Sequence, residues 1–363
     1  MSKTDPADPV RNVRLVPEAR EADHAARPLR DDFLNRWKGA AVIRFMDWQR
    51  TNDSPVTDWA DRTTPAAYSQ AAAGGVALEY MLAAADALGA DPWFCMPHRA
   101  TDDYVRSFAA AVKGRLPAGR KVYVEYSNEC WNGQFRQARY CQERGTKLGL
   151  SANAYEAQLR FYSKRAVEIF TLWEAEIPKG QLVRVLAAQS ANPWTGTTVL
   201  DFDDAAARAD AIAVAPYFGN KYGSPKTAAE VRALTPDALV AALKADVADS
   251  LKAVAKYAAE AKKRGVALVA YEAGQHLAGY AGAENDDGLT ALFAAANRHP
   301  GMEALYRDYF AGWRAAGGGL CAVFSSVGRP GKWGSWGALE YAGQPPADAP
   351  KFRAVRALLD AQR

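Results

Sequence analysis

Two carboxylates, each at the end of a strand-like run, are the residues in this chain best suited to chemistry. Valine and tyrosine residues within positions 121–132 favour a β-strand, and that run ends at Asn128-Glu129. A second apolar run, residues 267–271, stops at Glu272. A pair of carboxyl groups, one a proton donor and the other a nucleophile or base, is what cleavage of a glycosidic bond requires. The two runs therefore predict chemistry on a sugar linkage.

Strand-like and helix-like segments alternate along the chain, as in a parallel sheet covered by helices. Strands are predicted at residues 12–16, 41–47, 92–96, within 121–132, and at 183–187, 211–215, 267–271 and 320–324. Helical periodicity is found at residues 31–38, 75–88, 102–113, 134–148, 152–176, 236–263, 300–316 and 352–362. Strands in this number, interleaved with helices in 363 residues, predict an α/β fold, a (β/α)8 TIM barrel. One catalytic domain is expected over residues 1–363, with residues 1–10 as a disordered tail. A doubly wound open sheet is the alternative, but no GxGxxG turn follows the first strand.

Active sites of such barrels lie at the carboxyl ends of the strands, so strand-end residues are the candidates. They are rich in carboxylates, amides and aromatic rings, and comprise Arg44, Asp47, Trp48, His98, Asn128, Glu129, Trp131, Gln189, Tyr217, Glu272, Trp333 and Trp336. They lack the Asp/His clusters that hold a divalent metal, and no serine stands in a nucleophile-elbow turn. The sequence therefore predicts a site that needs no metal and no cofactor.

In their order along the chain, these residues resemble clan A of the glycoside hydrolases, the retaining (β/α)8 enzymes that include the family 5 cellulases and mannanases. In that clan an Asn-Glu pair ends the fourth strand and a Glu ends the seventh, as Asn128-Glu129 and Glu272 do here. The resemblance covers nearly the whole chain. The sequence departs from the clan at residues 130–132, where Cys-Trp-Asn follows the pair in place of the usual proline. This divergence puts the transfer of a substrate from the family in doubt.

The resemblance implies a double displacement, with Glu272 as nucleophile and Glu129 as acid/base. The two carboxyl groups of a retaining enzyme lie about 5–5.5 Å apart. Asn128 is then expected to bind the 2-hydroxyl of the sugar. A plain helix cap for Glu129 and a plain salt bridge for Glu272 are the alternatives, and the complete ordered set of residues weighs against both.

Further substrate-site residues follow from the same resemblance. Arg44 stands on the second strand, His98 beyond the third and Tyr217 at the end of the sixth. Tyr217 is expected to donate its hydroxyl to Glu272, and Arg44 to do the same from the barrel floor. Glu125, earlier on the fourth strand, is expected to be structural. His98 and Arg44 could equally serve the core.

Tryptophans at strand ends suit the binding of pyranose rings, whose CH groups pack on an indole face. Trp131, Trp333 and Trp336 stand at such ends, and Trp48 lies on a loop at the same face. One of Trp333 and Trp336 is expected at the cleaved sugar. The expected partner is a β-linked polysaccharide or oligosaccharide, with an endo-acting β-glucanase as the preferred interpretation. Transglycosylation on β-glycans and a non-catalytic glycan-binding barrel are the alternatives.

Composition excludes other classes of partner. The formal charge of +4 is spread along the chain, which argues against nucleic acid, and no apolar stretch is long enough to span a membrane. The cysteines form no CxxC pair; for Cys95 and Cys130 a disulfide is open, but free thiols are favoured. The N-terminus lacks the apolar core of a signal peptide. A polysaccharide substrate favours a secreted or periplasmic protein whose leader lies outside this chain, and localisation and oligomeric state stay open.

Overall fold

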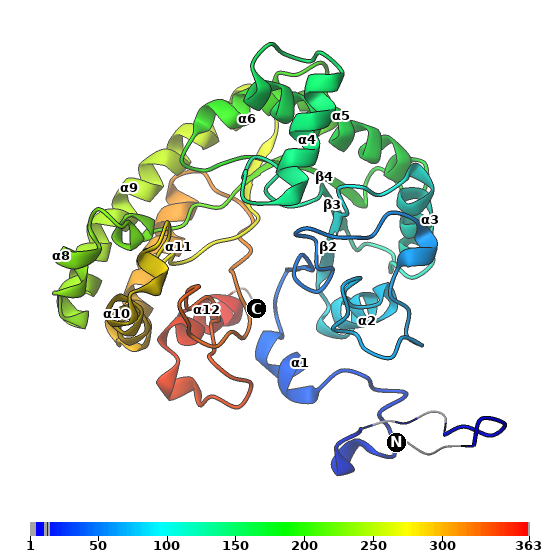
Figure 1. Ribbon diagram of the computed structural model, residues 1–363, viewed down its shortest axis with the longest axis horizontal. Coiled ribbons are helices and arrows are strands. Elements are labelled where there is room, and N and C mark those ends of the chain that lie inside the picture. The colour runs from blue at the N-terminus through cyan, green and yellow to red at the C-terminus, as the bar shows by residue number, and fades with distance from the viewer. Residues whose placement is uncertain (1–4, 11–12, 14, 362–363) are drawn as a thin grey trace.

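Six parallel strands form the centre of the fold, hydrogen-bonded in sequence order. The computed structural model describes residues 5–10, 13 and 15–361 (Figure 1). The strands are β1 (Val42–Arg44), β2 (Asp91–Met96), β3 (Val122–Tyr126), β4 (Leu182–Ala187), β5 (Ala211–Val214) and β6 (Ala267–Ala270). They are the second to the seventh of the predicted strands. The sequence identified them because helices cover the sheet and leave nearly continuous apolar runs, such as the fully buried β5.

Helices alternate with the strands and pack outside the sheet (Figure 1). They are α1 (Asp31–Trp37), α2 (Leu78–Leu88), α3 (Asp102–Lys113), α4 (Arg136–Lys147), α5 (Ala154–Glu174), α6 (Pro193–Leu200), α7 (Ala205–Arg208), α8 (Ala228–Arg232), α9 (Pro236–Lys263), α10 (Asp287–Arg298), α11 (Gly301–Ala315) and α12 (Pro350–Ala361). The side chains of Thr101 and Thr235 cap α3 and α9 by accepting from Tyr104 N and Ala238 N. The sequence missed α6, α7, α8 and α10.

The first and eighth predicted strands differ from the prediction. Residues 320–324 extend the sheet irregularly: Ala270 N donates to Leu320 O and Ala322 N donates to Ala270 O, both at 2.9 Å. The predicted strand at residues 12–16 lies partly outside the described residues. Its described part is not a strand, and Val13 and Leu15 are 64% and 102% exposed. A strand-like sequence pattern stabilises a strand only when its apolar side chains pack against other parts of the protein. The exposed Val13 and Leu15 have no such packing.

Helix α1 contacts helix α12 at its carboxyl end. The ring of Trp37 meets that of Phe352 edge-on, with centroids 5.7 Å apart, and its Nε1 donates to Ser326 Oγ at 2.8 Å. Arg356 on α12 donates to the carbonyl of Arg36 at 3.0 Å. These contacts join α1 to α12, although the two helices lie far apart in the sequence. The architecture is α/β of the (β/α)8 type, with six regular strands and an irregular segment in the eighth position.

Candidate active site

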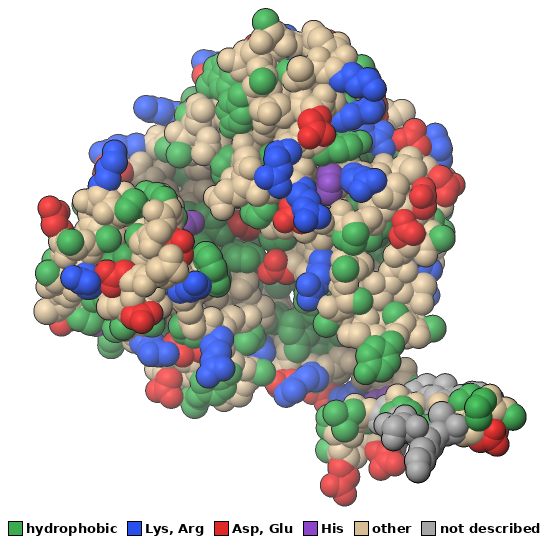
Figure 2. All heavy atoms as spheres, viewed as in Figure 1, with side chains coloured by type: hydrophobic (Ala, Val, Ile, Leu, Met, Phe, Trp, Pro, Cys, Tyr) green, Lys and Arg blue, Asp and Glu red, His purple; other side chains and the backbone are tan. Residues whose placement is uncertain are grey.

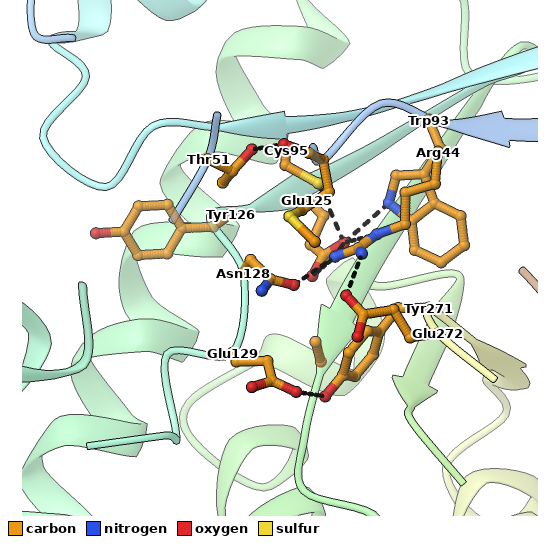
Figure 3. A network of polar contacts seen from close by, with 12 residues as sticks. Arg44, Thr51, Trp93, Cys95, Glu125, Tyr126, Asn128, Glu129, Tyr271 and Glu272 are labelled. Carbon is orange, nitrogen blue, oxygen red and sulfur yellow. Dashed lines mark hydrogen bonds and ion pairs between the residues drawn. The ribbon is translucent and has the colours of Figure 1, made fainter. Parts of the chain in front are cut away.

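The carboxyl ends of the strands bring the predicted residues to one edge of the sheet. Arg44 ends β1, Asn128 and Glu129 follow β3, and Glu272 follows β6. The parallel register sets Arg44 beside Trp93. Figure 3 shows these side chains converging on one polar network, and Figure 2 shows acidic side chains within a hollow of the face viewed.

The guanidinium of Arg44 is the centre of that network. It donates to both oxygens of Glu125, at 2.9 Å to Oε2 and 3.1 Å to Oε1. It also donates to Glu272 Oε1 at 3.2 Å and to Asn128 Oδ1 at 2.8 Å. The Arg44 side chain is only 5% exposed, so these contacts replace water as its hydrogen-bonding partners. One buried cation therefore links the strands that carry the two proposed catalytic carboxyls.

Glu125 is the most deeply buried of the three carboxyls, and protein groups enclose it. Besides Arg44, the indole Nε1 of Trp93 donates to Glu125 Oε2 at 3.0 Å, and Cys95 Sγ donates to the same oxygen at 3.6 Å. Burial raises the pKa of Glu125, and the neighbouring Arg44 opposes that rise. Because its side chain is fully covered, Glu125 cannot reach a substrate and acts as the counter-charge of Arg44.

Glu272 is bound by one charged and one neutral donor. Arg44 reaches its Oε1, and the hydroxyl of Tyr217 donates to its Oε2 at 2.9 Å. Burial raises the pKa of Glu272 to about 8, and the charge of Glu129 adds to this, whereas Arg44 and Tyr217 favour the ionised form. Tyr217 thus stands where the sequence expected it, next to the proposed nucleophile.

Among the described residues, the donors that contact the Glu129 carboxyl are both neutral. Tyr271 donates its hydroxyl to Oε1 at 2.9 Å, and Asn132 Nδ2 donates to Oε2 at 2.8 Å. Burial raises the pKa of Glu129 as well, while these two donors and the more distant Arg44 oppose the rise. The backbone of Glu129 has a φ of 44°, in the left-handed region that non-glycine residues rarely adopt. A non-glycine residue in this region costs about 1–3 kcal/mol and persists only where the surrounding structure holds it there.

The charge of Glu129 contributes to the raised pKa of Glu272, so the titration of one carboxyl depends on the other. Burial raises the pKa of both carboxyls, that of Glu272 to about 8. Glu272 has an ion-pair partner within 3.2 Å, and Glu129 has none among the described residues. The contacts of the two residues thus favour a charged Glu272 beside a protonated Glu129, which is the division of roles that acid/base and nucleophilic chemistry needs.

Asn128 is 2% exposed, and protein groups engage both ends of its amide. Its Oδ1 accepts from Arg44, and its Nδ2 donates to Asn52 Oδ1 at 3.0 Å. Gln137 in turn donates to Asn52 Oδ1 at 2.7 Å and to the carbonyl of Asn128 at 2.8 Å. The structure therefore places Asn128 as a link between Arg44 and the turn that follows β1.

Of the two tryptophans near the end of the chain, Trp336 lies with the site. Its ring centroid is 5.5 Å from that of Tyr217 and 4.8 Å from that of His276. Trp333 is 68% exposed, with Lys332 over its ring at 4.8 Å. The half-buried Trp336 therefore rests on the tyrosine that contacts Glu272, whereas Trp333 points to solvent.

Other predicted residues lie outside the network. His98 is 5% exposed and packs edge-on against Tyr140; burial and then Arg99 lower its pKa to about 4. Trp48 packs against Phe33 and Phe45, with centroids 5.9 and 5.5 Å apart. Neither contacts the carboxyls or Arg44 through any hydrogen bond or ring contact of the described residues.

The third predicted aromatic, Trp131, lies close to the Tyr271 phenol. The buried indole N–H of Trp131 has no hydrogen-bond acceptor at normal geometry among the described residues. The sequence missed the roles of Tyr271 and Asn132, although Tyr271 directly precedes Glu272 and Asn132 lies three residues after Glu129. Their position in the sequence could have indicated these roles, because each is a polar residue close to one of the two carboxyls.

No group of three or more His, Cys, Asp or Glu side chains is placed to hold a metal ion within residues 5–10, 13 and 15–361. All four cysteines are free thiols. No helix in the same residues is both long and apolar enough to cross a membrane.

Comparison with known proteins adds information on the fold. Neither a family model nor a curated protein matches the sequence. Among solved structures, the chain is similar to a GH51 arabinofuranosidase from Xanthomonas axonopodis pv. citri, with a TM-score of 0.50 and 14% identity over 82% of this chain. The chain spans 60% of the length of that protein. An apo β-glucosidase, 1317, aligns with 94% of this chain and 90% of its own, at 14% identity and a TM-score of 0.41.

Proposed function

We propose that this protein is a retaining glycoside hydrolase acting on a β-linked polysaccharide or oligosaccharide. The observation that carries the proposal is the unequal environment of two neighbouring carboxyls. Glu272 is hydrogen-bonded to Arg44 and Tyr217, whereas Glu129 is hydrogen-bonded, within the part of the chain that the structure describes, to the neutral donors Tyr271 and Asn132. Two carboxyls whose environments divide the roles of acid and nucleophile are the minimum that the double displacement needs.

In the proposed reaction, ionised Glu272 attacks the anomeric carbon while Glu129 gives its proton to the departing glycosidic oxygen. The C–O bond to the leaving group breaks, and an ester bond between the sugar and Glu272 forms. Glu129, now a carboxylate, removes a proton from water, and the resulting hydroxide displaces Glu272 from the sugar. Arg44 and Tyr217 hold the Glu272 carboxyl in place and stabilise it as a leaving group in the second step.

The finer proposal is endo action on a β-glucan. Trp336 supports a sugar ring at the cleaved position, because its ring rests on Tyr217 beside Glu272. The solved arabinofuranosidase supports the fold, and its activity gives reason to include arabinofuranosides among the substrates tested.

The test is a panel of polysaccharides and aryl glycosides, analysed for released sugars and for the anomer formed first. On the substrate that is cleaved, Glu129→Ala and Glu272→Ala should each lower kcat by roughly 10²–10⁴-fold, the usual effect of losing a catalytic acid or base. Glu143→Ala, which removes an exposed carboxyl on α4, is the matched control. Full activity in either site variant, or no cleavage anywhere in the panel, would contradict the proposal.

A further inference from the structure

The carboxyl of Glu129 is fixed at both of its oxygens. Tyr271 OH lies 2.9 Å from Oε1 and Asn132 Nδ2 lies 2.8 Å from Oε2. The two donors come from opposite parts of the chain, since Tyr271 follows β6 and Asn132 follows β3. Asn132 N also donates to the carbonyl of Glu129 at 2.8 Å, which closes the turn that carries the carboxyl. A carboxyl bonded at both oxygens cannot rotate freely.

The ring of Tyr271 also connects Glu129 to the cation at the centre of the site. The guanidinium carbon of Arg44 lies 5.0 Å from the ring centroid of Tyr271, within the range of a cation–π contact. A cation over the ring draws electron density from the phenol, which strengthens its O–H as a donor. Arg44 thus acts on Glu272 directly and on Glu129 through Tyr271 (Figure 3).

The Tyr271 phenol is suited to remain a donor throughout a reaction. It is 1% exposed, and burial together with the charges of Glu129 and Glu272 raises its pKa well above its usual range. It therefore stays protonated while Glu129 gains and loses a proton. A donor that does not titrate favours the ionised form of the carboxyl that it contacts.

We propose that Tyr271 and Asn132 are positioning residues that hold Glu129 and set the pH at which it releases its proton. The proposal rests on the assignment of Glu129 as acid/base. The two hydrogen bonds hold the carboxyl toward the leaving oxygen, and they ease the departure of its proton. Positioning of this kind matters because a displacement of about 1 Å can cost about 10²-fold in rate.

The test compares Tyr271→Phe with the wild-type protein by two readouts. The first is a ¹³C NMR titration of the labelled Glu129 carboxyl, assigned by its loss in Glu129→Gln, which requires no activity. Removing the O–H should shift the titration of Glu129 upward by roughly one pH unit, since a hydrogen bond to a charged group contributes about 1.5 kcal/mol or more. The second is the pH profile of kcat, whose basic limb should move the same way while kcat falls by roughly tenfold or more.

Tyr162→Phe is the matched control. Its hydroxyl is fully buried and accepts a hydrogen bond from Ala187 N at 2.7 Å, so this variant also loses one buried phenol contact. It should lower stability without moving the titration of Glu129. Asn132→Ala removes the second donor and should shift the titration in the same direction, which keeps the test available if Tyr271→Phe does not fold.

The possible results separate the two proposals. An unmoved titration in Tyr271→Phe, or in Asn132→Ala if only that variant folds, overturns the positioning role. A shifted titration in a protein that cleaves nothing in the panel supports the positioning role and contradicts the proposed hydrolase. An equal shift in Tyr162→Phe would show a general loosening of the fold and would also overturn the positioning role.

Discussion

Arg44 and Glu125 form an enclosed ion pair next to the candidate nucleophile Glu272, with side chains only 5% and 0% exposed. Removing one member leaves the other charge buried without its partner, which typically costs about 3–5 kcal/mol. Arg44→Met should therefore lower the free energy of unfolding by that amount, as measured by urea denaturation. It should also abolish activity, because Glu272 loses its charged donor.

A matched control for this loss is Arg264→Met. Arg264 pairs with Asp201 and Glu260, whose side chains are 56% and 28% exposed, and a pair of this kind near the surface contributes about 0–1 kcal/mol. The double variant Arg44→Met/Glu125→Leu should regain part of the stability lost in Arg44→Met, since the buried charge of Glu125 is then no longer left without its partner. Equal losses of unfolding free energy in Arg44→Met and Arg264→Met would show that the Arg44–Glu125 pair does not behave as a buried ion pair.

The pH dependence of kcat/KM should be bell-shaped around the form of the pair that holds one proton. Burial raises the pKa of Glu272 to about 8 and also raises that of Glu129. Activity should therefore fall at high pH as Glu129 loses its proton, at a pH above the usual carboxyl range because burial raises its pKa. It should fall at low pH as a second proton neutralises Glu272, with the acid limb above the usual carboxyl range of about 4.3. Undiminished activity at pH 10 would contradict a proton shared by the pair.

Tyr217→Phe should shift the acid limb of the pH profile, whereas Tyr271→Phe should shift its basic limb. Tyr217 donates to Glu272 Oε2, so its loss makes Glu272 easier to protonate and should move the acid limb to higher pH. Turnover should fall by roughly tenfold, because a hydrogen bond to a charged group contributes about 1.5 kcal/mol or more. Steady-state kinetics across the pH range measures both effects. A shift confined to the basic limb would show that Tyr217 does not act through Glu272.

The central strands were predictable because each is a short apolar run that helices cover. The first and the eighth strand positions were not predictable in this way, for two different reasons. Residues 12–16 carry an apolar pattern, but Val13 and Leu15 find no surface that would bury them. Residues 320–324 follow three glycines, and only a single bridge, from Cys321 to Ala270, joins them to β6. Burial by distant elements, which decides both cases, is not visible in a local pattern.

The two carboxyls stood out in the sequence because each interrupts an apolar run, but their partners did not. Tyr271 belongs to such a run and cannot be told from a core tyrosine by periodicity. β6 ends at Ala270, one residue earlier, so the strand alternation no longer decides where Tyr271 points. Asn132 reaches Glu129 only because Glu129 adopts a φ of 44°. Both contacts depend on a local backbone geometry that residue types alone do not specify.

Trp336 and Trp333 give the sharpest test of how the site would bind a sugar. The Trp336 ring contacts those of Tyr217 and His276, whereas Trp333 is exposed. Trp336→Ala should lower kcat/KM by roughly tenfold, because a stacked aromatic pair contributes about 0.5–1.5 kcal/mol beyond the area that it buries. Trp333→Ala should change it by less than about twofold, since its ring lies away from Tyr217 and Glu272. Kinetics on the cleaved substrate decides between them, and a larger loss in Trp333→Ala would place the sugar outside the network that Arg44 organises.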